Sequence, residues 1–447
     1  MTPARDDVKT SDAGGRAPAS DSPGPRNRSK HDRSNDDRVQ TSDGPDHRTN
    51  DNRTPSSEDH ESAWADRPWT DATLPETIED LRASIPALAE TTYMNFGASG
   101  PSPRPVVDAA TTFTSYHEFE APSGEGMYPA AFDTYEEVRT VVADFVGAAP
   151  EAVALTQSTT DGINRFACAL AWEPGDVVVR TDLEHPSGIL PWDRLERERG
   201  VEVRVVESER GRLDLDAYRD AVDGAKLVSF SAITWNYGTR LPVAELVEIA
   251  HDEGALVLVD AVQQPGQAPL AVNEWGADAV AAAGHKWLLG TWGGGFLYVD
   301  EAVATRLEPG CIGYRGVREA TASPYELASG ATRFEVGTTN PAAHVALARA
   351  IEITDKIGVE SIEDRIATLA DRLATAVPDD RLLSPRTPES GLVTIAVDDP
   401  AATVDRLADD GIVIRALPEP QAVRASIHAV NSRSEVDAVI DSLTEAW

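Results

Sequence analysis

Short apolar segments of strand length alternate with amphipathic helical segments through most of this chain, and this alternation is the strongest constraint on its fold. Apolar runs such as 227–231 and 256–259 are too short for helices, whereas 243–252 repeats apolar residues at helical spacing. Strands separated by helices usually pair in parallel, because the helix returns the chain to the same end of the sheet. We therefore expect an α/β fold, with a mostly parallel sheet covered by helices on both faces.

The same patterns locate the elements and divide the chain. The expected strands are Ala152–Leu155, Val177–Arg180, Val201–Val206, Leu227–Ser231, Leu256–Val259, Ala279–Ala282 and Gly295–Val299, with Tyr93–Gly97 as a further strand that enters a glycine turn. The expected helices are Leu81–Pro86, Asp161–Ala171, Pro191–Arg199, Val243–Asp252 and Ala342–Ile357. Residues 1–62 hold almost no large apolar side chain and are predicted to be a disordered tail. We expect residues 63–340 to form an N-terminal segment and a large domain, and 341–447 a smaller α/β domain over the carboxyl edge of the sheet.

A carboxylate and a lysine follow two of the predicted strands and suggest a pyridoxal 5′-phosphate (PLP) site. Asp260 ends the run Leu256–Val259, and Lys286 stands 26 residues later in Gly284-His285-Lys286-Trp287. A lysine can hold PLP as a Schiff base, while a carboxylate keeps the pyridine nitrogen protonated so that the ring accepts electrons. A lysine after a strand is more often a surface residue, but this chain has few lysines and flanks this one with glycine, histidine and tryptophan. We therefore predict that Lys286 and Asp260 are catalytic.

Other polar residues near strand ends suit the same cofactor. Thr159 and Thr160 lie where a strand passes through hydroxyl residues into a helix, which is either a plain helix cap or a phosphate cradle. His185 follows another strand, either as a structural histidine or as a ring that stacks on pyridine and moves protons. Gln263 lies three residues after Asp260, within reach of the ring hydroxyl.

The net charge of −35 argues against a nucleic-acid partner and suggests a high-salt environment. Residues 1–62 hold ten Lys/Arg and thirteen Asp/Glu, which leaves −32 for residues 63–447. Such a surface repels phosphate backbones. Dispersed carboxylates with only three lysines in residues 63–447 (Lys226, Lys286 and Lys356) are typical of a halophilic cytoplasmic protein, because concentrated salt screens their mutual repulsion.

Several other classes of protein are disfavoured by the composition. No apolar run approaches the ~18 residues of a membrane span, and the first residues lack a secretory signal. The two cysteines, Cys168 and Cys311, are too few for a disulfide framework and lack metal-ligand spacing, so no metal site is predicted. We expect a soluble cytoplasmic protein, with no membrane partner, that acts on a small molecule.

Taken together, these segments resemble the class V aminotransferase family of fold type I PLP-dependent enzymes, from about Leu81 to the C-terminus. The family includes cysteine desulfurases, selenocysteine lyases and isopenicillin N epimerases. The segments that carry the resemblance, in the order of the family, are Tyr93–Pro101, Thr159-Thr160, His185, Asp260–Gln263, His285-Lys286, Arg333–Thr338 and Arg424.

The resemblance implies roles that the spacing alone does not give. It makes His285 a phosphate ligand, with Thr159 and Thr160, and it makes Arg424 the clamp for the substrate α-carboxylate. It implies that Thr338 reaches the phosphate of a neighbouring subunit, and therefore a homodimer with shared active sites.

Departures from the family pattern decide between its branches. Ala283 stands where many desulfurases have a serine that contacts phosphate, and the segment between Arg415 and Arg424 lacks the sulfur-accepting cysteine of desulfurases. Cys168 is predicted to be an inert thiol in a core helix, and Cys311 a reactive thiol at a position that does not match. The leading hypothesis is therefore an enzyme with aminotransferase or epimerase-like chemistry at the α-carbon of an amino acid. A cysteine desulfurase or selenocysteine lyase and a non-catalytic PLP-binding protein are the alternatives.

Overall fold

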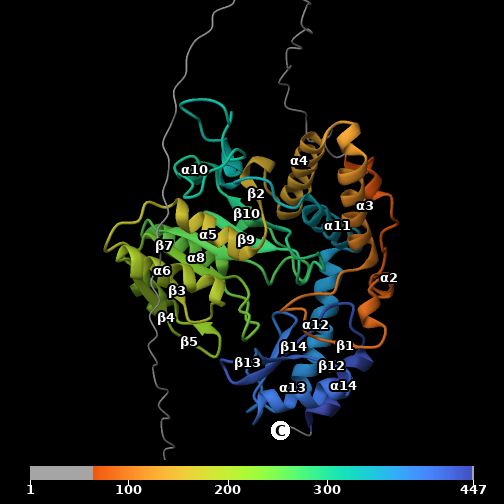
Figure 1. The fold of residues 1–447 in the computed structure, drawn as a ribbon. Helices are drawn as coiled ribbons and strands as arrows, with labels where there is room; N and C mark the ends of the chain where they lie inside the picture. The colour runs from red at the N-terminus through yellow and green to blue at the C-terminus, as the bar shows by residue number, and fades with distance from the viewer. Residues whose placement is uncertain (1–63, 445–447) are drawn as a thin grey trace, which may run out of the picture. The chain divides into compact units, whose positions relative to one another are not determined.

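A mixed sheet forms the centre of the computed structural model, which describes residues 64–444 (Figure 1). Within these residues the sheet has seven strands in the order β2-β10-β9-β8-β7-β3-β4, and β10 runs antiparallel to both of its neighbours. The other neighbouring pairs are parallel. The strands are β2 (Val153–Thr156), β3 (Val177–Thr181), β4 (Glu202–Val206), β7 (Leu227–Ser231), β8 (Leu256–Asp260), β9 (Ala279–Ala283) and β10 (Gly295–Val299). Each was predicted to within one residue at either end, and the α/β fold is confirmed.

Both faces of this sheet are covered, as continuous apolar strands require. Side chains alternate between the faces along a strand, so Val257 and Val259 of β8 enter one apolar cluster while Leu258 enters another. The first cluster is completed by α3 (Arg104–Phe119), α4 (Met127–Val146), α7 (Leu215–Val222), α8 (Val243–Asp252) and α11 (Pro341–Ile357). The second is completed by α5 (Thr159–Ala169), α6 (Leu190–Arg199) and α10 (Glu301–Ala304).

The predicted helices are present, and the first one is shifted. Leu81–Pro86 was expected, but the helix is α2 (Ile78–Ala83). Thr77 sets its start, because its side chain accepts the backbone N–H of Asp80. Pro86 begins a separate 3₁₀ turn, since proline cannot continue the hydrogen-bond pattern of a helix interior. The short helix α9 (Val272–Trp275) lies between β8 and β9, and the hairpin strands β5 (Ser208–Glu209) and β6 (Arg212–Leu213) between β4 and α7.

A smaller antiparallel sheet lies in the C-terminal part of the chain. It consists of β11 (Leu392–Ile395), β13 (Arg415–Leu417) and β14 (Ala422–Ser426), and it shares an apolar core with α12 (Val359–Ala376), α13 (Pro400–Asp409) and α14 (Arg433–Thr444). The N-terminal strand joins this region: β1 (Thr92–Tyr93) pairs with β12 (Ile412–Val413). The predicted strand 93–97 is therefore mostly wrong, because Phe96 to Ala98 form a turn.

The proposed division of the chain stays a prediction. The described residues belong to one compact unit, and the suggested boundary at residue 340 lies within it, at the start of α11. The predicted tail over 1–62 lies outside the described residues. Among residues 64–444, no helix is long and apolar enough to cross a membrane.

Candidate cofactor and substrate site

A cavity of about 150 Å³ lies where β7, β8 and β9 end, the edge at which parallel sheets bind ligands. Eight of the nine predicted site residues line it: Thr159, Thr160, His185, Asp260, Gln263, His285, Lys286 and Arg424. Thr338 does not.

Lys286 is held on a tight turn after β9 by the N-terminal glycine segment. The backbone N–H of Gly100 donates to the carbonyl oxygen of His285 over 2.8 Å. A Cβ at Gly100 would lie 2.2 Å from the carbonyl oxygen of Lys286, so this approach requires glycine. Burial lowers the pKa of Lys286 to about 8 although Asp260 opposes the shift, and the cations Arg424 and Arg415 contribute to the lowering. The amine is therefore neutral far more readily than that of an ordinary lysine.

Asp260 and Gln263 are buried beside the lysine. Oδ1 of Asp260 accepts the backbone N–H of Val262 over 2.9 Å, and burial raises the pKa of its carboxyl although that hydrogen bond and Lys286 oppose the shift. Nε2 of Gln263 donates to Gly97 over 3.0 Å, and its Oε1 accepts from Trp287 over 2.8 Å. The Gln263 amide thus joins the N-terminal segment to the lysine turn, while its role toward a ring hydroxyl stays a prediction.

His185 is oriented by its own loop and by a tryptophan. Its Nδ1 accepts the backbone N–H of Ser187 over 3.3 Å, so the neutral ring carries its proton on Nε2. The ring lies edge-to-face with Trp235, 5.5 Å between centroids. Burial lowers the pKa of His185 to about 4, with contributions from Lys286 and the two arginines. A neutral, flat imidazole therefore lies in the wall of the cavity near the lysine.

The N-terminus of α5 supplies the groups expected of a phosphate cradle. Oγ of Ser158 caps the helix by accepting the backbone N–H of Asp161 over 3.1 Å. Oγ1 of Thr160 is 2.7 Å from Oγ of Ser187, and the buried Oγ1 of Thr159 has no partner in the described residues. A buried hydroxyl without a hydrogen-bond partner at a helix N-terminus is suited to binding an anion such as a phosphate. His285 also lines this cavity, and burial lowers the pKa of its ring to about 4.

Two arginines lie opposite each other on β13 and β14. Arg415 and Arg424 are register partners across this antiparallel pair, an unfavourable place for two like charges. Arg424 is 0% exposed, and only its Nη1 has a partner, the carbonyl oxygen of Trp235 at 2.5 Å. Burial, assisted by Arg415, lowers the pKa of Arg424 to about 9. No ion pair involving either guanidinium is found within residues 64–444. A buried, unpaired guanidinium costs stability, so an anionic ligand is the expected partner.

The unpartnered Thr159 hydroxyl and Arg424 nitrogens, beside Lys286 and Asp260, fit PLP together with a carboxylate substrate. Thr338 instead lines a separate cavity of about 400 Å³ with Tyr135 and Thr339. Its predicted contact with the phosphate of a neighbouring subunit stays a prediction.

Several residues in and behind this cavity were not predicted as site residues, and four of them have side chains that bear on its chemistry. Arg415, Trp235 and Ser187 line the cavity. Buried Glu184 lies behind it and accepts from the hydroxyls of Thr181 and Ser231, each over 2.6 Å. Burial raises the pKa of Glu184 to about 7. Glu184, Trp235 and Ser187 could have been predicted as site residues, because each follows the end of a strand. Arg415 could not, because its position depends on the register of two short strands, which the sequence does not give.

The prediction that Cys168 lies in the core is wrong. Its helix was predicted, but the thiol is exposed. The buried residues of α5 include Ile163, Phe166 and Ala167, a stripe at helical spacing that Cys168 lies beside. No cysteine lines the cavity that contains Lys286.

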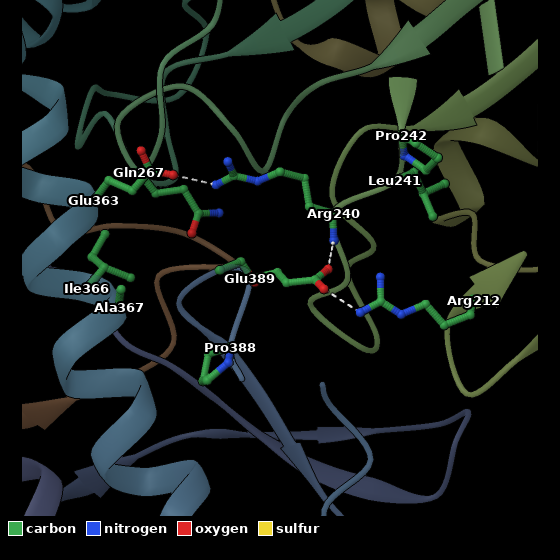
Figure 2. Close-up of a pocket in the computed structure, with 11 residues that line it drawn as sticks. Arg212, Arg240, Leu241, Pro242, Gln267, Glu363, Ile366, Ala367, Pro388 and Glu389 are labelled. Atoms are coloured by element: carbon green, nitrogen blue, oxygen red, sulfur yellow. Dashed lines mark hydrogen bonds and ion pairs between the residues drawn. The ribbon is translucent and has the colours of Figure 1, made fainter. Parts of the chain in front are cut away.

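A larger cavity of about 580 Å³ also has two arginines in its wall, but here both are paired (Figure 2). Arg240 forms an ion pair of 2.6 Å with Glu363 of α12, and its backbone N–H donates to Glu389. Glu389 also pairs with Arg212 of β6. These contacts connect loops next to the large sheet with the segment that leads into β11.

Comparisons with known proteins agree with this geometry. A family model described as Aminotransferase class-V matches residues 92–439. A protein of Methanothermobacter thermautotrophicus named probable cysteine desulfurase is 35% identical over 394 residues, which cover 82% of this chain and 97% of that protein.

Two solved structures resemble the described fold closely. The apo cysteine desulfurase from Thermococcus onnurineus NA1 has a TM-score of 0.76 and 31% identity, covering 84% of this chain and 98% of that one. The cystine C-S lyase C-DES, in complex with its reaction product cysteine persulfide, has a TM-score of 0.77 and 26% identity, covering 81% and 99%. A variant of that lyase has glycine covalently linked to its PLP cofactor. The predicted PLP fold type I and the predicted cofactor, pyridoxal 5′-phosphate, are confirmed.

Proposed function

Because the chain belongs to the class V aminotransferase family of PLP-dependent enzymes, we propose that it breaks the C–S bond of a sulfur-containing amino acid. The names of its relatives, cysteine desulfurase and cystine C-S lyase, support this proposal. They favour the desulfurase alternative of the sequence analysis over transamination or epimerisation, which the comparisons support only at the level of the family.

The observation that carries the finer proposal is the set of groups around Lys286. The cavity presents the lysine and two unpaired arginines, but no cysteine. The chain has only two cysteines, and both line a different cavity. Without an enzyme thiol to take the sulfur, the sulfur must leave with the electrons of the C–S bond. A more acidic leaving group departs faster, which favours a persulfide over a simple thiolate.

The substrate we propose is therefore an amino-acid disulfide such as L-cystine. In a β-elimination, the Cα–H and Cβ–S bonds break, and cystine with one water yields cysteine persulfide, pyruvate and ammonia. Cystine carries two carboxylates, matching the two arginines. Arg424 binds the α-carboxylate beside the reacting carbon, and Arg415 binds the distal one.

The side chains of the cavity divide the remaining work. When bound, PLP supplies the electron sink at the α-carbon. Lys286 moves the α-proton, since its lowered pKa of about 8 lets the amine gain and lose a proton near neutral pH. Asp260 would hold the proton of the pyridine nitrogen, and His185 would lie against the ring. Thr159, Thr160 and His285 would bind the phosphate.

The test is product analysis with the holoenzyme. With L-cystine we expect equal amounts of pyruvate and persulfide, and none from a Lys286→Ala variant. Alanine and sulfide formed from L-cysteine, abolished in a Cys311→Ser variant, would show a thiol-dependent desulfurase instead. Transfer of the amino group to a keto acid, or racemisation without sulfur release, would contradict the proposal and support aminotransferase or epimerase-like chemistry instead.

We also propose a homodimer in which Thr338 contacts the phosphate bound by its partner, in a high-salt cytoplasm. Light scattering gives the number of subunits. The Thr338→Val variant should bind PLP more weakly while the number of subunits stays the same. A monomer at working concentration contradicts the shared site.

The halophilic proposal predicts a melting temperature that rises from low to molar salt, and an unchanged melting temperature contradicts it.

A further inference from the structure

Both cysteines of the chain line one cavity, although 143 positions separate Cys168 from Cys311. The cavity has a volume of about 260 Å³ and is distinct from the Lys286 site. Cys168 comes from the last turn of α5, and Cys311 from the segment after α10. Both thiols are free and exposed.

The backbone next to Cys311 touches Cys168. A Cβ at Gly310 would lie 2.7 Å from the Cβ of Cys168 and 2.4 Å from its carbonyl oxygen. Consecutive Cα atoms are about 3.8 Å apart, so the Cα of Cys311 lies about 3.8 Å from that of Gly310, which makes this contact. Only glycine permits the two segments to approach so closely, so the two cysteines lie on neighbouring segments of one cavity.

The surroundings favour sulfur chemistry over metal binding. Within residues 64–444, no group of three or more histidine, cysteine or acidic side chains could hold a metal ion. Arg194 of α6 lines the cavity with both cysteines, and its guanidinium also pairs with Glu198 over 2.9 Å. Cys168 is exposed only in part: the burial that remains raises the pKa of its thiol, and Arg194 opposes this shift. We therefore expect Cys311, on the exposed segment, to attack first.

We propose that Cys168 and Cys311 form a dithiol site that reacts with the S–S bond of a low-molecular-weight disulfide or persulfide and closes to a protein disulfide. This activity goes beyond the elimination proposed at Lys286 and does not require it.

Each reaction balances without another oxidant. With a disulfide, the Cys311 thiolate attacks one sulfur and expels the first small thiol. Cys168 then attacks the Cys311 sulfur and expels the second, so two protein thiols are oxidised and one disulfide is reduced to two thiols. With a persulfide, the same oxidation of the protein yields one small thiol and one hydrogen sulfide.

The experiment uses the full-length reduced protein with Lys286→Ala, so that failure of the elimination cannot affect the result. One arm receives L-cystine and the other glutathione persulfide, followed by alkylation of free thiols, intact mass and peptide mapping. We expect a protein lighter by two hydrogens, with the two cysteine peptides linked. Closure in one arm alone assigns the sulfur source. Separate adducts on both thiols, or no reaction in either arm, would overturn the proposal.

Matched variants separate a built site from two ordinary surface thiols. Cys168→Ser should trap a stable adduct on Cys311, because the resolving thiol is missing. Arg194→Gln should slow formation of the protein disulfide several-fold, whereas Arg197→Gln, at an exposed position of the same helix, should not. Closure at an equal rate in denaturant would contradict the role of proximity, since unfolding separates the two segments.

Discussion

Two cavities of this molecule each hold a pair of arginines, and the pairs are in opposite electrostatic states. In the larger cavity, Arg212 and Arg240 pair with Glu389 and Glu363 (Figure 2). In the Lys286 cavity, Arg415 and Arg424 face each other, and no carboxylate among residues 64–444 pairs with them. An arginine that pairs with a carboxylate connects segments of the fold. A buried arginine without such a partner can instead form an ion pair with an anionic ligand.

The lysines repeat this contrast. Lys226 pairs with Asp176 over 2.6 Å, and Lys356 with Glu76 over 3.0 Å. Lys286 has no ion-pair partner in the described residues, and burial lowers its pKa to about 8. In a chain with so many carboxylates, a cation without an ion-pair partner indicates a ligand site. Lys286 lines the same cavity as the two arginines that lack ion-pair partners.

The largest effect is expected at Arg424. Replacing it with Gln should lower kcat/KM for the amino acid by about 30-fold to several thousand-fold, because truncating one member of a buried charge pair costs about 2–5 kcal/mol. Stability should be unchanged or higher, since an uncompensated buried charge is removed. Steady-state kinetics and thermal unfolding measure the two effects. Loss of stability with unchanged kinetics would mean that Arg424 is structural.

The pKa of Lys286 gives the second prediction, on cofactor loading. A lysine is neutral above its pKa, and only the neutral amine condenses with the PLP aldehyde. The rate of reconstitution of cofactor-free enzyme should therefore rise about tenfold per pH unit below pH ~8 and level off above it. The absorbance of bound PLP follows the reaction. A rate that keeps rising through pH 10 would indicate an ordinary lysine.

Arg415 should show a smaller effect that depends on the substrate. Arg415→Gln should lower kcat/KM for L-cystine about tenfold, the size expected for one charge-assisted hydrogen bond. For a disulfide of cysteine with an uncharged thiol, the variant and the wild type should be nearly equal. An equal loss on both substrates would contradict recognition of the distal carboxylate.

The smallest effect is expected in the paired cavity. Arg240→Gln should cost about 0.2–1 kcal/mol of stability, the usual worth of a partly exposed ion pair, and leave KM unchanged. Thermal unfolding and kinetics on the same preparation give both values. A large rise in KM would show that this cavity also serves the substrate.

The sequence predicted the central sheet well because its strands are buried on both faces and end at clear turn residues. The strand-end carboxylate Asp260 and the lysine turn followed from the same pattern. The α2 boundaries were missed because a threonine cap, not periodicity, fixes the start. Arg415 could not be paired with Arg424 from the sequence, since the register of β13 and β14 is set by the short connection between them.

Cys168 shows a different kind of error. Its helix was predicted, and the apolar stripe of that helix already excluded it from the core. The proximity of Cys311 to Cys168 could not be foreseen, because it depends on a contact between Gly310 and α5 that joins distant parts of the sequence.

The central claim is that C–S bond cleavage at Lys286 needs no thiol from this chain. Its most direct test is kcat/KM for L-cystine in the Cys168→Ser/Cys311→Ser double variant, which contains no cysteine. We expect the wild-type value, within about twofold, with persulfide and pyruvate as products. Loss of sulfur release in this variant, with PLP still bound, would contradict the claim.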